Sequence, residues 1–201
     1  MPPTTVLIAS NNRHKLVELS QLLAALPIKL ITPAELGLSI DIPETGLTYR
    51  ENARLKADAF AKRSGLFSLA DDSGLEVIAL EGWPGVYSAR IGGPDATDAE
   101  RQQLVLARLA EKTGAKREAR FVCEVVLASP AGIVGEAQGT LEGTIADAPR
   151  GDAGFGYDPI FIPTGYDQTF AELSPTEKNA ISHRARAIAN LQSTLEHLPS
   201  N

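Results

Sequence analysis

The stretch Thr4–Thr32, "TTVLIASNNRHKLVELSQLLAALPIKLIT", decides the fold class of this chain. It begins with an apolar, β-branched run that predicts a strand, and a second run of this kind, "IKLIT", closes it. Between the two runs, leucines recur at helical spacing: Leu16, Leu19, Leu22, Leu23 and Leu26. The stretch therefore predicts a βαβ unit, the repeating element of α/β proteins.

Alternation between helices and strands continues downstream. Thr48 and Glu51 have the spacing of a capping box and predict a helix over 49–64. Its predicted buried face carries Ala53, Ala57 and Phe60. The run "LFSLA" predicts a strand, and a further helix is expected from about Thr97 to Lys112. Its apolar positions include Leu104, Leu106 and Leu109.

The second half of the chain has a different pattern. Residues 119–145 predict consecutive antiparallel strands with a Ser-Pro-Ala-Gly turn, and "FGYDPIFIP" predicts another extended piece. Ser174, Pro175 and Glu177 then open a helical segment that runs towards Leu198. Because both crossover and hairpin connections are present, we predict an α/β protein with a long mixed β-sheet flanked by helices. No linker or internal repeat divides the sequence, so we expect one domain over 1–201.

Composition excludes several classes of protein. The chain has 201 residues, 43% of them hydrophobic, and a formal charge of −6 that is spread along the sequence, which argues against a polynucleotide partner. No run of about eighteen apolar residues predicts a membrane span. The single cysteine, Cys123, cannot form an internal disulfide and indicates a reducing compartment. We expect a cytoplasmic protein.

Three basic residues follow the first strand at a place where helices disfavour them. Asn12 is a good N-cap, which places Arg13, His14 and Lys15 in the first helical turn. The positive end of the helix dipole disfavours each cation there by about 0.3–1 kcal/mol. Exposed residues tolerate so small a penalty, but three in a row suggest an anion site beside free backbone amides.

Two further cations share helix faces with core residues. Lys56 lies one turn from both Ala53 and Phe60, and Arg184 precedes Ile188 on the inner stripe of the last helix. One interpretation is that their aliphatic stems cross the core to reach solvent. The alternative is that their charged groups are aimed into a cleft.

The run "LADDSGLEV" places two acids, Asp71 and Asp72, before Ser73 and Gly74. Neighbouring side chains of an extended chain point in opposite directions, so Asp72 could hold Mg²⁺ or orient water while Asp71 binds a lysine or amides. Alternatively, both carboxylates cap a Ser-Gly turn. Glu44 in "IPETG" could reach the same cation, and hard oxygen ligands favour Mg²⁺ over zinc.

Six stretches, in order along nearly the whole chain, resemble one known family. They are "SNNRHKLVEL", "ETGLTYRENARLKA", "LADDSGLEV", "GVYSARIGG", "GFGYDPIF" and "ELSPTEKNAISHRARA". The sequence is similar to the noncanonical purine nucleoside triphosphate pyrophosphatases, also called the inosine triphosphate pyrophosphatase-like or Ham1-like family. The resemblance implies hydrolysis of inosine, deoxyinosine and xanthosine triphosphates (ITP, dITP and XTP) to the monophosphate and pyrophosphate. It also implies a homodimer whose long sheet lies between two lobes with a central nucleotide cleft.

The resemblance also assigns roles to residues. The catalytic set is Asp72, Asp71 and Lys56, and the residues that hold Mg²⁺ are Glu44 and Asp72. Phosphate and supporting contacts fall to Lys15, Lys56, Ser10, Asn12 and Ser73. The remaining nucleotide contacts fall to Lys178, His183 and Arg184, the last two near the base edge, and a wall is formed by Phe155, Gly156, Tyr157 and Asp158. Donors at the base edge would favour a 6-keto purine over adenine.

Some alternatives stay open at this point. Phe155 could stack on a purine or plug the core at a glycine-rich turn. The chain could be a pyrophosphatase for modified pyrimidines or methylated bases, with the same phosphate contacts. It could also be a nucleotide-binding sensor without turnover, although the three acids Glu44, Asp71 and Asp72 argue for water activation.

Overall fold

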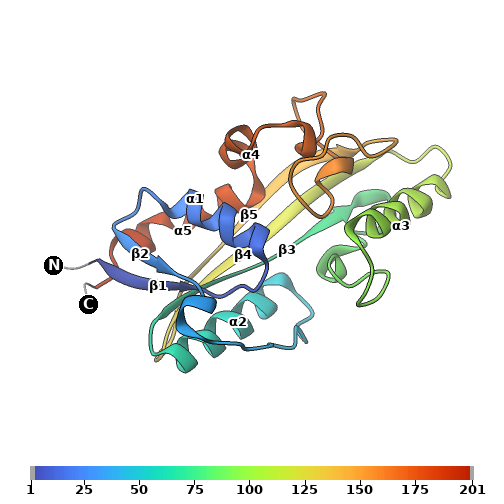
Figure 1. The fold of residues 1–201 in the computed structure, drawn as a ribbon. Coiled ribbons are helices and arrows are strands. Elements are labelled where there is room, and N and C mark those ends of the chain that lie inside the picture. The colour runs from blue at the N-terminus through green and yellow to red at the C-terminus, as the bar shows by residue number, and fades with distance from the viewer. Residues whose placement is uncertain (1–2, 200–201) are drawn as a thin grey trace. The chain divides into compact units, whose positions relative to one another are not determined.

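The computed structural model describes residues 3–199 and contains six strands and five α-helices within them (Figure 1). In chain order they are β1 (Thr4–Ile8), α1 (Arg13–Leu23), β2 (Ile28–Ile31), α2 (Tyr49–Ser64), β3 (Phe67–Val77), α3 (Asp98–Ala110), β4 (Glu118–Ser129), β5 (Gly132–Ile145), β6 (Phe161–Pro163), α4 (Pro175–Ile181) and α5 (His183–Glu196). In this described range, no helix combines the length and the apolar character that a membrane span requires.

The six strands form one sheet in the order β2-β1-β3-β4-β5-β6. Strand β1 pairs in parallel with both β2 and β3, whereas β5 and β6 are antiparallel. The sheet is therefore mixed, and the predicted α/β class is confirmed. The predicted βαβ unit is β1-α1-β2, whose strands pair from Thr4 with Ile28 to Leu7 with Ile31.

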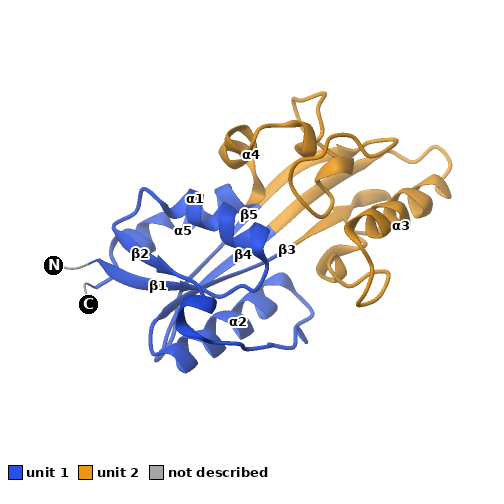
Figure 2. Ribbon diagram, viewed as in Figure 1, with its two compact units in different colours: residues 1–72, 123–139, 184–201 blue, residues 73–122, 140–183 orange. Residues whose placement is uncertain are grey.

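The chain divides into two compact units (Figure 2). Unit 1 comprises residues 1–72, 123–139 and 184–201, and unit 2 comprises residues 73–122 and 140–183. Strands β3, β4 and β5 each contribute residues to both units. The single domain over 1–201 stays a prediction.

Unit 1 carries helices on both faces of its strands (Figure 1). Val6 and Ile8 of β1 belong to a buried cluster with residues of α1 and α5, while Leu7 and Ala9 belong to a cluster with α2. This division follows from the pleat, which turns successive side chains to opposite faces. Strand β1 is buried on both sides, so it reads as a continuous apolar run in the sequence.

Helix α2 has the bounds that the sequence predicts. Thr48 and Glu51 form the capping box reciprocally, and Gly65 ends the helix with a φ of 74°. The alanines and the phenylalanine of the predicted inner face are buried: Ala53, Ala57 and Phe60. Because alanine side chains are small, this face of α2 can approach the sheet closely. The other side chains on this face of α2 therefore lie near β3.

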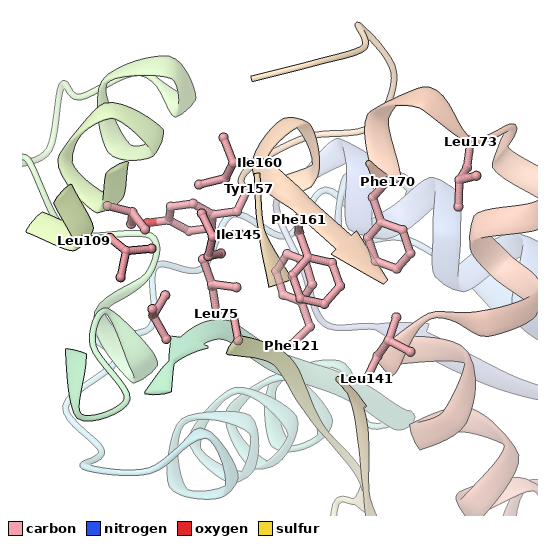
Figure 3. Close-up of a cluster of buried hydrophobic side chains, with 13 residues drawn as sticks. Leu75, Leu109, Phe121, Leu141, Ile145, Tyr157, Ile160, Phe161, Phe170 and Leu173 are labelled. Atoms are coloured by element: carbon pink, nitrogen blue, oxygen red, sulfur yellow. The ribbon is translucent and has the colours of Figure 1, made fainter. Parts of the chain in front are cut away.

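Unit 2 has its own aromatic core (Figure 3). The Phe121 ring lies 4.6 Å from Phe161 and 5.9 Å from Phe170, measured between centroids. Helix α3 adds Leu109, which is 3% exposed, whereas Leu104 is 41% exposed and lies on its outer side. The helix was predicted correctly, but its inner face is carried by Val105 rather than by Leu104.

Three sequence predictions need correction. Strand β3 continues from Phe67 through Val77, so Ser73 and Gly74 lie in an extended strand and form no turn. The carboxy-terminal segment is two helices, because Ser182 takes the extended conformation, with φ −62° and ψ 155°, and separates α4 from α5. In "FGYDPIFIP", only residues 161–163 are strand, and a short 3₁₀ turn precedes them.

Candidate active site

The two adjacent acids of β3 have different surroundings. Leu69 lies in the cluster with α1 and α5, and Ala70 lies in the cluster with α2. By strand alternation, Asp71 shares the face of Leu69 and Asp72 shares the face of Ala70. The prediction that the two carboxylates do different jobs therefore has a geometric basis, and the alternative of a shared Ser-Gly turn is wrong.

Asp71 is bound by cations from α1 and α5. Its Oδ2 atom lies 3.0 Å from Lys15 Nζ and 3.0 Å from Arg184 Nη2. Arg184 Nη1 also pairs with Glu18 of α1. The Arg184 side chain is 1% exposed and that of Asp71 is fully buried, so these charges are held away from solvent.

The pKa values of this cluster follow from burial and charge together. Burial alone would raise the pKa of Asp71, but Lys15 and Arg184 outweigh it and hold that pKa well below its ordinary value. Burial would likewise lower the pKa of Arg184, and the carboxylates of Asp71 and Glu18 raise it instead. Asp71 and Arg184 are therefore both ionised at neutral pH.

Asp72 is bound by side chains of α2. Its Oδ1 atom accepts a hydrogen bond from Lys56 Nζ at 3.0 Å, and its Oδ2 atom accepts one from Asn52 Nδ2 at 3.2 Å. The same Lys56 ammonium donates to Glu44 Oε1 at 2.8 Å. One cation thus bridges two carboxylates that lie 28 positions apart in the sequence.

The Asp72 carboxylate is incompletely compensated. Burial raises the pKa of Asp72, and the attraction of Lys56 offsets only part of that rise. Burial would lower the pKa of Lys56, but Asp72, Asp71 and Glu44 outweigh it, so that pKa is raised. Lys56 remains a cation while Asp72 has an affinity for protons or further positive charge.

Glu44 and Asp72 suit a hard divalent cation. Among residues 3–199, no group of three or more His, Cys, Asp or Glu side chains is arranged to hold a metal ion. Two carboxylates are sufficient for Mg²⁺ when substrate phosphates and water supply the other oxygen ligands. The two carboxylates converge on one Lys56 ammonium, at 2.8 Å and 3.0 Å, and this convergence supports the fit.

The turn before α1 is organised around Asn12. Its side chain accepts hydrogen bonds from the backbone N–H groups of His14 and Lys15, as predicted for an N-cap. The N–H of Asn12 donates to Ser10 Oγ at 3.2 Å. The first turn of α1 contains no acidic residue, and Arg13, His14 and Lys15 lie there at the positive end of the helix dipole. Ser73, which the resemblance also assigns to the supporting contacts, is half-buried on β3.

In unit 2, two of the predicted wall residues, Phe155 and Asp158, contact Lys178. Its Nζ lies 2.6 Å from Asp158 Oδ2 and 4.9 Å from the centre of the Phe155 ring. Lys178 and Asp158 are 5% and 3% exposed, so the pair is shielded from water. Asp158 Oδ2 also accepts the backbone N–H of Phe155 at 2.8 Å. This fixes the loop against α4.

The Gly156 peptide is held by α3. Gln102 Nε2 donates to the Gly156 carbonyl at 2.6 Å, and the Gly156 N–H donates to Asp98 Oδ2 at 2.7 Å. Tyr157 is buried and its hydroxyl donates to the Ser88 carbonyl at 2.7 Å. These hydrogen bonds therefore hold the loop that carries Phe155.

His183 and Arg184 are adjacent in sequence but belong to different units. The His183 ring stacks on Phe121, with a centroid distance of 4.6 Å and an interplanar angle of 10°, and is 4% exposed. Arg184 lies in the Asp71 cluster described above. The structure thus places Arg184 against carboxylates rather than on an open surface.

Sequence analysis missed several residues of these arrangements, including the three that follow. Glu18 pairs with Arg184, Asn52 binds Asp72, and Gln102 holds Gly156. Asn52 had a signal, because it lies four residues before Lys56 and shares its helix face. Gln102 and Glu18 gave none, since polar residues at such positions are ordinary on helix surfaces.

Comparison with known proteins identifies the relatives of this chain. A model of the Ham1 family matches residues 6–194. The chain belongs to the Ham1 family. A protein of Mycobacterium tuberculosis named dITP/XTP pyrophosphatase is 49% identical over 199 residues, covering 97% of each chain. A Coxiella burnetii protein of the same name is 47% identical over 194 residues, covering 94% of this chain and 96% of that one.

Solved structures of Ham1 proteins share the fold. The Ham1 protein of Coxiella burnetii superposes with a TM-score of 0.87 and 45% identity, covering 97% of this chain and all of that one. The Staphylococcus aureus Ham1 protein gives a TM-score of 0.84 and 42% identity, covering 96% and 98% of the two chains. The mixed sheet and helices described above are therefore those of Ham1 proteins.

Proposed function

We propose that this chain is a nucleoside-triphosphate pyrophosphatase that removes deaminated purine nucleotides, namely dITP, ITP and XTP, from the nucleotide pool. One observation carries the proposal: the Lys56 ammonium bridges Glu44 and Asp72 in a chain whose Ham1 relatives are named dITP/XTP pyrophosphatases. An acidic pair with one shared cation suits the binding of a metal and a polyphosphate.

Asp72 is the proposed general base. The residue is 6% exposed, and hydrogen bonds from Lys56 and Asn52 fix the orientation of the carboxylate that would accept the proton of an attacking water. Lys56 orients the carboxylate through the hydrogen bond to Oδ1 and is the proposed partner of a phosphate oxygen. In-line displacement at a phosphorus atom then needs positioning and charge compensation more than covalent chemistry.

Glu44 and Asp72 are the proposed Mg²⁺ ligands. The ion, when bound, would neutralise charge on the phosphate oxygens and the leaving pyrophosphate. Lys56 keeps the two carboxylates within reach of one site by donating to both. The magnesium identity rests on the ligand chemistry, because hard oxygen donors without His or Cys favour it.

The first turn of α1 is the proposed phosphate contact. Lys15, with a side chain 15% exposed, and the backbone amides near Asn12 present positive charge there. Ser10 and Ser73 are assigned supporting contacts. Asp71 supports this site by fixing Lys15, so its contribution to catalysis is made through that lysine.

Residues of unit 2 are the proposed contacts for the rest of the nucleotide. Phe155 offers a ring face to the purine, and Gly156, Tyr157 and Asp158 form the wall around it. Lys178 and His183 are assigned the remaining nucleotide contacts of this unit. Arg184 is proposed to act at the base edge, which requires a change of partners from Asp71 and Glu18.

The bond that is cleaved tests the proposal. The protein should be incubated with Mg²⁺ and, in parallel, dITP, ITP, XTP, GTP and ATP, and the phosphorus products followed by ³¹P NMR. We expect pyrophosphate and monophosphate from the 6-keto deaminated purines, with much slower release from ATP. Orthophosphate as the first product would contradict the proposal, and tight binding without product would favour the sensor. A preference for modified pyrimidines would favour the other pyrophosphatase.

Assembly and location complete the proposal. A homodimer is expected from the resemblance, and sedimentation velocity at micromolar protein would measure it. A cytoplasmic location is consistent with Cys123, which is buried and forms no disulfide.

A further inference from the structure

Asn52 of α2 connects two segments of unit 1 that carry the proposed metal ligands. Its side chain is fully buried, at 0% exposure. The Nδ2 group donates to Asp72 Oδ2 at 3.2 Å on β3, and Oδ1 accepts the backbone N–H of Gly46 at 2.8 Å. Gly46 lies two residues after Glu44 in the loop that precedes α2.

The two contacts fix the orientation of the amide. Rotating it by half a turn would place its carbonyl oxygen against the Asp72 carboxylate and its NH₂ group against the Gly46 N–H. Both new pairs would be repulsive, because each would join two acceptors or two donors. The side chain therefore has one favourable orientation, which specifies both partners at once.

The close approach of the loop requires glycine at position 46. A Cβ atom there would lie 2.7 Å from Asn52 Oδ1 and 2.7 Å from the Glu51 Cβ. Such distances are too short for a real Cβ, so a larger residue would push the loop away from Asn52. The loop is thus shaped to receive the Asn52 carbonyl.

The neutral side chain of Asn52 also suits this position. Glu44, Asp72 and Lys56 together carry one net negative charge. A neutral amide donates to Asp72 without cancelling that charge, so the pair keeps its attraction for a cation. An Asp of equal size would add a carboxylate beside Asp72, and like charges at such a distance repel.

We propose that Asn52 is a positioning residue that sets the distance between Glu44 and Asp72 by holding the Gly46 loop and the Asp72 carboxylate together. The inference rests on the proposed function, since it concerns the same two carboxylates. Partners of metal-binding carboxylates commonly change metal affinity or activity by about 10- to 100-fold when they are removed.

The first experiment measures the loop without metal or nucleotide. Amide hydrogen exchange at Gly46 should be at least about tenfold faster in Asn52→Ala than in the parent, because the acceptor is gone. Asn52→Asp keeps an acceptor oxygen and should retain most of the Gly46 protection. Asn190→Ala is the matched control, because that exposed amide donates to the Gln138 carbonyl at 2.8 Å on the same unit. Equal Gly46 exchange in the parent and in Asn52→Ala would overturn the proposal.

The second experiment separates positioning from a loss of folding. Under conditions where circular dichroism shows each variant folded, Asn52→Ala and Asn52→Asp should lower kcat about 10- to 100-fold. Asn52→Ala should also raise the Mg²⁺ concentration for half-maximal rate. The KM for nucleotide at saturating Mg²⁺ should change less than about threefold, because the side-chain partners of Asn52 described above, Asp72 and Gly46, are not among the proposed nucleotide contacts. Unchanged kcat and Mg²⁺ dependence in folded Asn52→Ala would overturn the proposal.

A second variant covers the case in which Asn52→Ala does not fold. Gly46→Ala keeps the side chains of Asn52 and Asp72 but adds a Cβ 2.7 Å from Asn52 Oδ1, so it should reproduce the shift in Mg²⁺ dependence. Normal Mg²⁺ dependence in Gly46→Ala would overturn the proposal. If the parent itself releases no pyrophosphate, the proposed function fails, while the exchange experiment still decides whether Asn52 holds the loop.

Discussion

The side chains of Asp71 and Asp72 leave β3 on opposite faces of the sheet, although the two residues are adjacent in sequence. Asp71 pairs with Lys15 and Arg184, and Asp72 pairs with Lys56. Burial would raise the pKa of both carboxylates. Cations outweigh this effect at Asp71, whose pKa is lowered, but not at Asp72, whose pKa is raised. The same substitution at the two positions should therefore have different consequences.

Asp72→Asn should remove turnover without weakening the fold. Loss of a general base typically lowers rates about 10²- to 10⁴-fold, so we expect a kcat decrease in that range. Because the pKa of Asp72 is raised in the folded state, folding disfavours its ionised form, and a neutral amide avoids that destabilisation. Pyrophosphate release and urea denaturation check the two expectations. Activity close to that of the parent would remove Asp72 from its proposed role.

Asp71→Asn should destabilise the protein. It leaves Lys15 and Arg184 buried with less negative charge beside them, and breaking a buried pair costs about 3–5 kcal/mol. Urea denaturation measures the loss. Asp58→Asn is the matched control, because the Asp58–Lys62 pair lies on the surface at 2.8 Å and should contribute about 0.3–0.5 kcal/mol. Equal effects of the two substitutions would contradict this prediction.

The same carboxylate predicts a pH dependence of stability. The pKa of Asp71 is lower in the folded protein than in the unfolded chain, so its stabilisation is present above the ordinary value of about 3.9. It is lost progressively as the pH falls below that value, because the unfolded chain then binds the proton first. Thermal denaturation from about pH 5 down to pH 3 should show a shallower loss for Asp71→Asn than for the parent.

Cys123 should be unreactive in the folded protein. Its thiol is buried on β4, and burial, together with the Asp71 carboxylate, raises the pKa of Cys123 to about 12. The thiolate that reacts with iodoacetamide is therefore almost absent at pH 8. Mass spectrometry should find alkylation only after urea unfolds the chain. Rapid labelling of the native protein would show that this face of the sheet opens.

Gln102→Ala should weaken nucleotide binding without touching the catalytic carboxylates. The variant loses the hydrogen bond to the Gly156 carbonyl, which contributes about 0.5–1.5 kcal/mol. We expect the KM to rise about 2- to 12-fold, since about 1.4 kcal/mol corresponds to a tenfold change. Gln192→Ala, which removes an exposed bond to Glu196, is the control. An unchanged KM and substrate ranking would show that the Phe155 loop does not depend on α3.

Local patterns predicted a large part of the molecule. The βαβ opening, the Asn12 N-cap and the bounds of α2 were all predicted, because capping and apolar periodicity are short-range effects. The Ser73–Gly74 pair was misread because residues that favour turns can also continue a strand, as they do in β3, which runs on to Val77. The break at Ser182 was missed because a helical apolar pattern continues across it.

The sequence by itself determined the α/β class, the family resemblance, and the cations and acids that distinguish this chain from an ordinary soluble domain. Only the tertiary structure decided which charges meet. Asp71 met Lys15 and Arg184, and Asp72 met Asn52 and Lys56, which also binds Glu44. The physical reason is that strand pleating and helix packing, rather than distance along the chain, select the partner of a buried charge.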